Sequence, residues 1–437
     1  MISSPQRSTS ISPETMGDVH CNNKKKKMRR RKRNKKKVTP ELILASNYIH
    51  QWAFGCFADD PEKVADRVLF ELHCHSSCSD GFLAPSAVVE RAHSNGVKVL
   101  ALTDHDTMAG VLEAMEAAHK FDMKVIPGVE ISTLYSPREE SENEEPVHIL
   151  AYYGSCGPAR FEELEGLLAE IRDGRYLRAR KMLIKLGKLK MPLEWEHVVK
   201  IAGNGVAPGR LHVAQAMVEA GHVENLKQAF SRYLYDGGPA YAKGNEPFAE
   251  AVVQLISRTG GIAALAHPWA LKNPVAIIRS LKAAGLHAIE VYRSDGKLAG
   301  FSDLADAHGL VKLGGSDYHG RRHRDEPDLG CVDLPVFDVY EFLKLARPIW
   351  FEAIKDMLLN FAEESSHVNL DKILRFGGLN NYKFYSTVGH SNDLVGEYPS
   401  LWLDNQENEA AEFEAIRLKL SHTILNKSGL QMPVMSG

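Results

Sequence analysis

The chain has 437 residues, of which 44% are apolar and 25% charged, so it is long enough for a barrel-sized domain with additional segments. Its formal net charge of −3 conceals an asymmetry, because residues 24–37 hold 12 basic and no acidic side chains. The remainder carries 41 basic and 56 acidic side chains, about −15, which excludes a broad surface that coats nucleic acid. No apolar run reaches the roughly 18 residues of a membrane span, so we expect no membrane partner.

The basic run lies in a polar, Ser-rich segment that cannot bury a core, and we expect residues 1–40 to form a disordered basic tail. Such a run indicates nuclear targeting, loose attraction to RNA phosphates, or only a solubilising tail, and we favour targeting. Six cysteines without a paired framework fit a reducing compartment. We therefore expect an intracellular protein, which is nuclear if the run from Lys24 to Lys37 is a targeting signal and cytoplasmic otherwise.

After the tail, a helical segment is expected over residues 41–65, and strands and helices then alternate. The first strands are expected over 67–74, 97–103 and 123–132, and the helices between them over 85–95 and 107–121. Asp106 precedes the second of these helices and is expected to be its N-cap. A fourth strand over 147–153 is followed by helical patterns alone, which predicts a helical insertion over about 158–245.

Alternation then resumes with expected helices over 247–258, 273–284 and 301–308, and expected strands over 261–266, 287–292 and 310–315. Repeated strand-then-helix units favour a parallel sheet with right-handed crossovers. We expect the barrel domain to cover residues 66–335. Residues 336–437 are expected to form a helical and partly disordered C-terminal extension.

Two imidazoles and a carboxylate follow the first of these strands. In an extended chain His73 and His75 point to the same side, and a tight turn at Gly81 can bring Asp80 back toward them. Imidazole and carboxylate are ligands for Zn²⁺, Mn²⁺ or Fe²⁺ rather than members of a structural thiolate site. A pair of histidines alone is weak evidence, since many such pairs are surface accidents.

The same residue types recur along the chain, mostly where apolar strands end. The further candidates are His105, Glu130, His148, His267, Asp317 and His319. A satisfied core histidine would explain any one of them, but not the recurrence. In a parallel α/β barrel the strand ends meet at the C-terminal face, where active sites are built, so the pattern favours a metal site there.

The ordered motifs HxH…D, TDHD, PGVE, a lone His, AHP and GSDYH resemble the PHP (polymerase and histidinol phosphatase) superfamily of metal-dependent phosphoesterases. Within the helical insertion, the stretch from Gly209 to Ala214 is similar to the TrpH and RNase AM-like branch. Members of that branch hydrolyse 3′,5′-bisphosphonucleotides and the 5′ ends of short RNAs. The resemblance implies an α/β fold, a distorted (β/α)₇ TIM-like barrel. The helical insertion and the disordered termini are expected from the sequence pattern itself.

The resemblance also implies three divalent metals in a row. The first would be held by His73, His75, Glu130 and Asp317. The second would share Glu130 and add His148 and His267, and the third would be held by Asp80, His105 and His319. Nitrogen and oxygen ligands favour Mn²⁺ or Fe²⁺, with Zn²⁺ as the alternative. Asp104 is a candidate to orient His105, and its alternative is a turn residue at a strand end.

Clustered cations would lower the pKa of a bound water, so we expect a metal-bound hydroxide to attack the phosphorus. Arg178 and Arg210 in the insertion are candidates to clamp a substrate phosphate, and Lys243 is a weaker one. Ordinary helix-surface charge is the alternative for each. The expected substrate is a bisphosphonucleotide or a short 5′-phosphorylated RNA.

Two other functions stay open. One is a monophosphatase of the histidinol-phosphate type, which the helical insertion argues against. The other is a metal-bound RNA-binding or regulatory protein, which the basic tail supports. The sequence leaves open the native metal, the preferred substrate, the oligomeric state and the role of residues 336–437.

Overall fold

The structure is a computed structural model. It describes residues 39–54, 67–137, 144–203, 205–295, 300–321, 326–364, 366–376 and 416. The compact unit that contains the barrel begins at Pro40. The basic run 24–37, and the disorder expected at both termini, lie outside the described residues.

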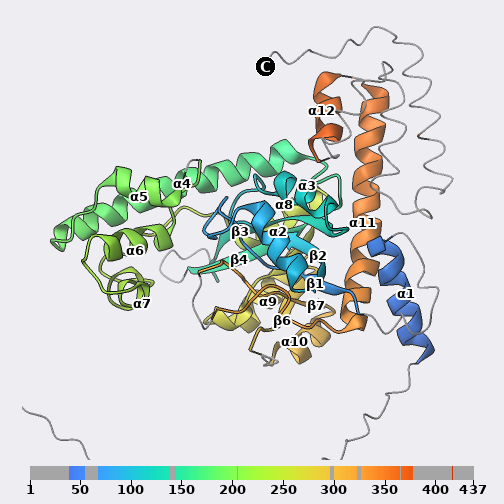
Figure 1. Cartoon of the computed structure of the whole chain (residues 1–437), viewed down its shortest axis with the longest axis horizontal. Coiled ribbons are helices and arrows are strands. Elements are labelled where there is room, and N and C mark those ends of the chain that lie inside the picture. Colours follow the sequence, from blue (N-terminus) through green and yellow to red (C-terminus); the bar gives the residue numbers. More distant parts are fainter. Residues whose placement is uncertain are drawn as a thin grey trace, which may run out of the picture. The chain divides into compact units, whose positions relative to one another are not determined.

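Seven strands form one sheet whose spatial order follows the chain (Figure 1). They are β1 (Leu69–Glu71), β2 (Val97–Leu102), β3 (Lys124–Tyr135), β4 (Glu145–Tyr152), β5 (Ile262–Leu265), β6 (Ala288–Tyr292) and β7 (Val311–Gly314). Most strand residues are apolar and buried, as expected where both faces of a sheet are covered. All seven lie at the positions that the sequence predicts.

The expectation of a wholly parallel sheet is wrong at β4. This strand pairs antiparallel with both β3 and β5, while the remaining neighbours are parallel. The physical reason is the short link between Tyr135 and Glu145, because a parallel crossover needs a dozen or more residues. β4 therefore runs against the others, and this places His148 near its middle rather than at a C-terminal strand end.

Among the described residues, β7 and β1 are not paired as strands, but the segments that follow them are joined. The backbone N–H of His75 donates to the carbonyl of Tyr318 (2.8 Å), and the N–H of Asp317 donates to the carbonyl of His73 (2.9 Å). The first and last strands thus meet at one end of the sheet. The fold is the distorted seven-stranded α/β barrel that the sequence predicts, with an open ladder between its first and last strands.

Four helices connect parallel neighbouring strands: α2 (Pro85–Ser94), α3 (Val111–His119), α9 (Pro274–Ala284) and α10 (Phe301–His308). A fifth, α8 (Ala249–Arg258), leads from the insertion into β5, and all five pack their apolar sides on the sheet. A short 3₁₀ turn, Pro268–Ala270, follows β5. None of the described helices is long and apolar enough to cross a membrane.

Asp106 does not cap the helix that follows it. α3 begins only at Val111, with Gly110 at its N-cap. Asp106 is fully buried with a positive φ of 54°, and its carboxylate accepts a hydrogen bond from the backbone N–H of Ser132 (2.7 Å). The same carboxylate is ion-paired with Arg175 (2.5 Å). It therefore ties the loop after β2 to β3 and to the helical insertion.

The insertion is helical, as predicted, and has its own apolar core (Figure 1). It consists of α4 (Phe161–Lys188), α5 (Trp195–Ala202), α6 (Arg210–Glu219), α7 (Leu226–Ala229) and a single π-helical turn, Phe230–Leu234. No strand interrupts these helices in the described part of the insertion. α4 reaches from this core back to the sheet, since Leu164, Leu168 and Ile171 pack in the barrel core.

Three helices flank the barrel domain in sequence: α1 (Pro40–Phe54), α11 (Val336–Glu363) and α12 (His367–Arg375). α1 and α11 pack together and against one side of the sheet. Trp350 of α11 is 5% exposed, and its ring packs at a tilt beside that of Trp52 in α1. Its Nε1–H donates to the carbonyl of Tyr152 in β4 (3.2 Å). The described part of the C-terminal extension is therefore integral to the barrel core.

Substituting Trp350 tests this conclusion. We expect Trp350→Ala to lower the free energy of unfolding by about 3–5 kcal/mol, because it leaves a cavity among packed aromatic rings. Phe337→Ala on the same helix is the control, since Phe337 is 48% exposed and should change stability by about 0.5 kcal/mol or less. Equal effects of the two variants in denaturant unfolding would show that α11 is not part of the core.

Candidate metal centre

The buried side chains His73 and His75, which follow β1, point to one side and meet the same two carboxylates. Their Nε2 atoms lie 3.3 and 3.2 Å from Oε2 of Glu130 in β3. They lie 3.4 and 3.2 Å from Oδ1 of Asp317, which follows β7. Asp317 reaches the two histidines because the segments after the first and last strands are joined, and Glu130 reaches them from β3.

Glu130 is the centre of the site. It is 1% exposed, and its two carboxylate oxygens are within 3.3 Å of a ring nitrogen of five histidines. These are His73, His75, His105, His148 and His267. Burial alone would raise the pKa of Glu130, but the surrounding histidines His105, His73 and His148 hold it well below its usual range.

The ligand candidates form a row, with Glu130 toward one end and Asp80 and His319 at the other. Nε2 of His319 is 3.3 Å from Oδ1 of Asp80, and Nδ1 of His75 is 3.8 Å from the same oxygen. The His75 ring stacks on the ring of His319 and is tilted against that of His105, with centroids 4.3 and 4.7 Å apart. The row therefore continues from Glu130 to Asp80 through packed imidazoles.

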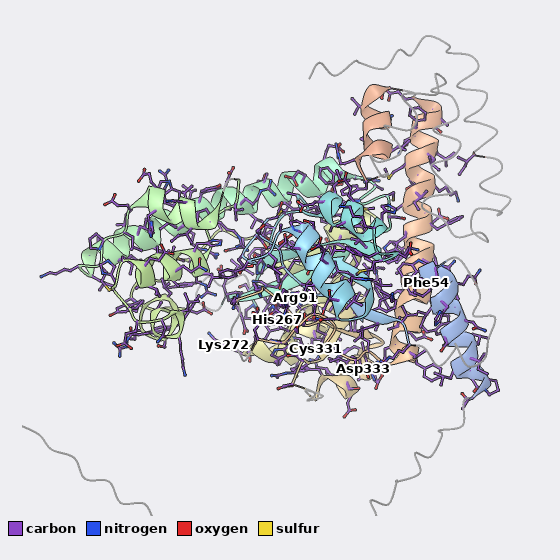
Figure 2. All side chains as sticks on the ribbon, in the orientation of Figure 1. Phe54, Arg91, His267, Lys272, Cys331 and Asp333 are labelled. Carbon is purple, nitrogen blue, oxygen red and sulfur yellow. The ribbon has the colours of Figure 1, made fainter. Side chains whose placement is uncertain are left out.

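Three sets of ligand atoms are close enough to hold an ion each. They are His73, His75, Glu130 and Asp317; His105, Glu130 and His148; and His75, Asp80, His105 and His319. The first is the set that the sequence resemblance implies. The other two sets differ from the implied ones, because His105 belongs to both of them and His75 belongs to the first and the third. His267 (labelled in Figure 2) is in none of the three sets and contacts Glu130 at 3.0 Å.

The donor atoms fit divalent cations. Several are buried and have no hydrogen-bond partner, although buried polar atoms are normally paired. They include Nε2 of His73, both ring nitrogens of His75, Nδ1 of His105 and Oδ1 of Asp80. The set contains no thiolate, because the nearby Cys74 turns its thiol to the carbonyl of Ala101 (3.3 Å). Nitrogen and carboxylate oxygen donors of this kind suit Mn²⁺, Fe²⁺ or Zn²⁺.

Two buried carboxylates that sequence reasoning missed hold the ligands in place. Glu290 of β6 accepts from the ring of His73 at Nδ1 (3.0 Å) and from the backbone N–H of His267 (2.6 Å). Glu71 of β1 accepts from the backbone N–H groups of His73 (3.2 Å) and Ser316 (2.9 Å). The available signal was an acidic residue inside an otherwise apolar strand.

Asp104 does not orient His105. Its buried carboxylate accepts hydrogen bonds from the backbone N–H and hydroxyl of Ser76 (2.7 and 2.6 Å) and from the hydroxyl of Ser79 (2.6 Å). Burial raises its pKa, and these hydrogen bonds oppose that rise. Asp104 is thus the turn residue considered as the alternative, and it fixes the loop that presents Asp80.

Beside this row is a cavity of about 200 Å³ that borders three of the ligands, Asp80, His105 and His148. Arg178 and Arg210, the predicted phosphate clamp, both line it. Neither guanidinium is without a partner, because Arg178 is ion-paired with Glu246 and Arg210 with Asp236 (2.5 Å). The structure therefore brings these two cations to the site and leaves Lys243 outside the cavity lining, paired with Glu144 (2.6 Å).

Arg175 of α4, which sequence reasoning missed, is largely buried and is not a helix-surface residue. Its side chain is 11% exposed, pairs with Asp106 and donates to the hydroxyl of Ser132 (2.7 Å). It also lines the cavity. Arg321, which follows the last ligand, lines the cavity from the other side, 3.9 Å from Asp80.

Glu290 offers a test of the ligand geometry without altering a ligand. We expect Glu290→Gln to weaken metal affinity by about 10- to 100-fold, because a neutral amide holds the His73 ring less firmly in its ligating orientation. Glu113→Gln is the control, since the Glu113 carboxylate accepts only from Ser86 on the exposed side of α3. Competition with a metal chelator measures both, and unchanged affinity in Glu290→Gln would contradict the role.

Comparison with known proteins agrees with this geometry. The PHP domain model matches residues 71–204, from β1 to just beyond α5. The 3′,5′-nucleoside bisphosphate phosphatase of Chromobacterium violaceum is 32% identical over 289 residues, which cover 64% of this chain and 95% of that protein. The 5′-3′ exoribonuclease of Haemophilus influenzae is 38% identical over 199 residues, which cover 46% of this chain and 68% of that protein.

Among solved structures, an amidohydrolase from Chromobacterium violaceum with bound sulfate matches with a TM-score of 0.55 at 32% identity. The match covers 66% of this chain and 97% of that one. The PHP domain match itself includes β2 to β4 and the ligand candidates from His73 to His148. The chain belongs to the PHP domain family.

Proposed function

We propose that this protein is a metal-dependent phosphoesterase that hydrolyses 3′,5′-bisphosphonucleotides or the 5′ ends of short RNAs. The observation that carries the proposal is one row of imidazoles and carboxylates, several of them buried, bordering a cavity lined by arginines. The two relatives described above are a bisphosphate phosphatase and an exoribonuclease, which supports a substrate with a nucleotide and more than one phosphate.

The ligand row would hold divalent cations, and we propose three, of Mn²⁺ or Fe²⁺, with Zn²⁺ as the alternative. Cations bound there supply the positive charge that lets water attack a phosphate ester at neutral pH. The chain itself positions them, because Glu130 contributes to two of the three ligand sets. No serine or cysteine nucleophile is needed, and the thiol of Cys74 is directed away from the row.

The arginines explain why the substrate should carry a second charge. Arg178 and Arg210 belong to the helical insertion and line the same cavity as His148 and Pro146 of β4. A guanidinium matches phosphate geometry, and a phosphate can replace the carboxylates of Glu246 and Asp236 as its partner. The bound sulfate of the solved relative fits an anion site in this fold.

A substrate panel tests the function. Purified protein loaded with Mn²⁺ should hydrolyse 3′,5′-bisphosphonucleotide and 5′-phosphorylated RNA, and should turn over histidinol phosphate poorly because that ester lacks a second anion for the arginines. Chelation should remove the activity and Mn²⁺ should restore it. Preference for histidinol phosphate would favour the monophosphatase alternative, whereas RNA binding by the metal-loaded protein without turnover would favour the regulatory alternative.

Substituting Arg210 tests whether it binds the second phosphate of the substrate. Arg210→Ala should lower kcat/KM for a bisphosphonucleotide by about 10- to 150-fold, the range for losing one charge-assisted hydrogen-bonded pair, and should spare an aryl phosphate, which has no second phosphate. Arg279→Ala is the control, because Arg279 is an exposed residue of α9. A uniform loss on both substrates would mean that Arg210 is structural, and no loss on either would leave Arg178 as the clamp to test.

A further inference from the structure

A second cavity, of about 340 Å³, lies next to the first and shares Asp80, His105 and Arg175 with it. It therefore borders the same end of the ligand row. Its other wall belongs to the helical insertion and includes Arg172 of α4 and His212 of α6. The phosphate clamp proposed above does not involve this wall.

The tautomer of His212 follows from one hydrogen bond. The backbone N–H of Gly209 donates to Nδ1 of His212 at 3.0 Å. A backbone N–H can only donate, so Nδ1 must be an unprotonated acceptor. His212 is the third residue of α6, and its side chain thereby satisfies a backbone group at the start of the helix, as the third residue of a capping box does.

The ring is also held neutral. His212 is 5% exposed, and burial lowers its pKa, while Asp80 raises it and Arg175 lowers it by smaller amounts. In a neutral imidazole whose Nδ1 is an acceptor, Nε2 carries the hydrogen. His212 is therefore a fixed donor, and the Nε2 edge is the part of the ring that remains for a cavity ligand.

This donor differs from the arginines of the same wall. Arg175 is paired with Asp106, and Arg172 is paired with Glu165 and donates to the carbonyl of Asp106 (2.8 Å). Both cations thus already have acceptors of the chain, although the buried Nε of Arg175 makes no hydrogen bond. Within the described residues, no carboxylate forms an ion pair with His212, although Asp80 lies near enough to affect its pKa. A phosphate oxygen, which only accepts, is the chemical partner that such a donor suits.

We propose that the Nε2–H of His212 donates a hydrogen bond to a phosphate oxygen of the substrate at the Asp80 and His105 end of the ligand row. This rests on the proposed phosphoesterase function and adds a residue of the helical insertion that contacts the reacting phosphate group. The insertion would then contribute both to recognition of a second phosphate, through Arg210, and to placement of the phosphate at the ligand row.

Two amide substitutions separate this role from the structural one. In His212→Asn, the side-chain oxygen takes the position of Nδ1 and still accepts from Gly209, but the donor at the Nε2 position is lost. In His212→Gln, the longer amide can place an N–H near the Nε2 position, but it abandons the Gly209 N–H. The first variant removes the donor and keeps the helix cap, and the second does the reverse.

The readouts are thermal unfolding, metal content, calorimetric binding of inorganic phosphate to the Mn²⁺-loaded protein, and kcat/KM for 3′,5′-bisphosphonucleotide. We expect His212→Asn to keep the melting temperature and metal content of the wild type while phosphate affinity and kcat/KM fall by about 10- to 100-fold. His212→Gln should melt at a lower temperature and recover part of the phosphate affinity.

Wild-type phosphate affinity in His212→Asn would overturn the proposal, whether or not the variant is destabilised. So would a His212→Gln variant that binds phosphate more weakly than His212→Asn, because this would assign the whole effect to the helix cap. Failure of the phosphoesterase function itself would appear differently, as a wild-type protein that binds phosphate and Mn²⁺ but hydrolyses none of the esters.

Discussion

The structure depends on one buried carboxylate. Glu130 has almost no exposure to solvent, and five imidazoles surround its two oxygens. Gathering so many polar groups around a buried carboxylate is costly unless charge is balanced there. Several of these ring nitrogens make no hydrogen bond although they lie close to its oxygens, and divalent cations are the groups whose charge and coordination would satisfy them.

The barrel is arranged so that this cluster can form. Its ligands come from the segments after β1, β2, β5 and β7 and from β3 and β4 themselves, which only a nearly closed sheet brings together. Two of them, His267 and Asp317, have positive φ angles of 28° and 53°, a conformation that costs energy for residues other than glycine. The carboxylates of Glu290 and Glu71 accept from backbone N–H groups at these turns and hold them in place.

The sequence was sufficient for the parts of the structure that leave a periodic or repeated signal. The strands, the helical insertion and the gathering of the ligand types follow from apolar runs that carry histidines and carboxylates. It was not sufficient where a residue acts through a partner distant in sequence. In sequence Asp106 resembles a helix cap, and only the structure shows that it contacts Arg175 and Ser132. Glu290 likewise resembles an ordinary strand residue, and only the structure shows its contact with the His73 ring.

The direction of β4 was within reach of the sequence, because its link to β3 is too short for a parallel crossover. The sharing of His75 and His105 between neighbouring ligand sets was not, since it depends on distances of a few ångströms between loops. The same holds for the tautomer of His212, which only the position of the Gly209 N–H defines.

The most direct test is the metal content of Glu130→Gln. At saturating Mn²⁺, elemental analysis of the wild type should find an ion for each of the three ligand sets. Neutralising the carboxylate that belongs to two of those sets should remove at least one ion per chain, while circular dichroism shows the fold retained. A Glu130→Gln protein that binds the full wild-type complement would contradict the central role of this carboxylate.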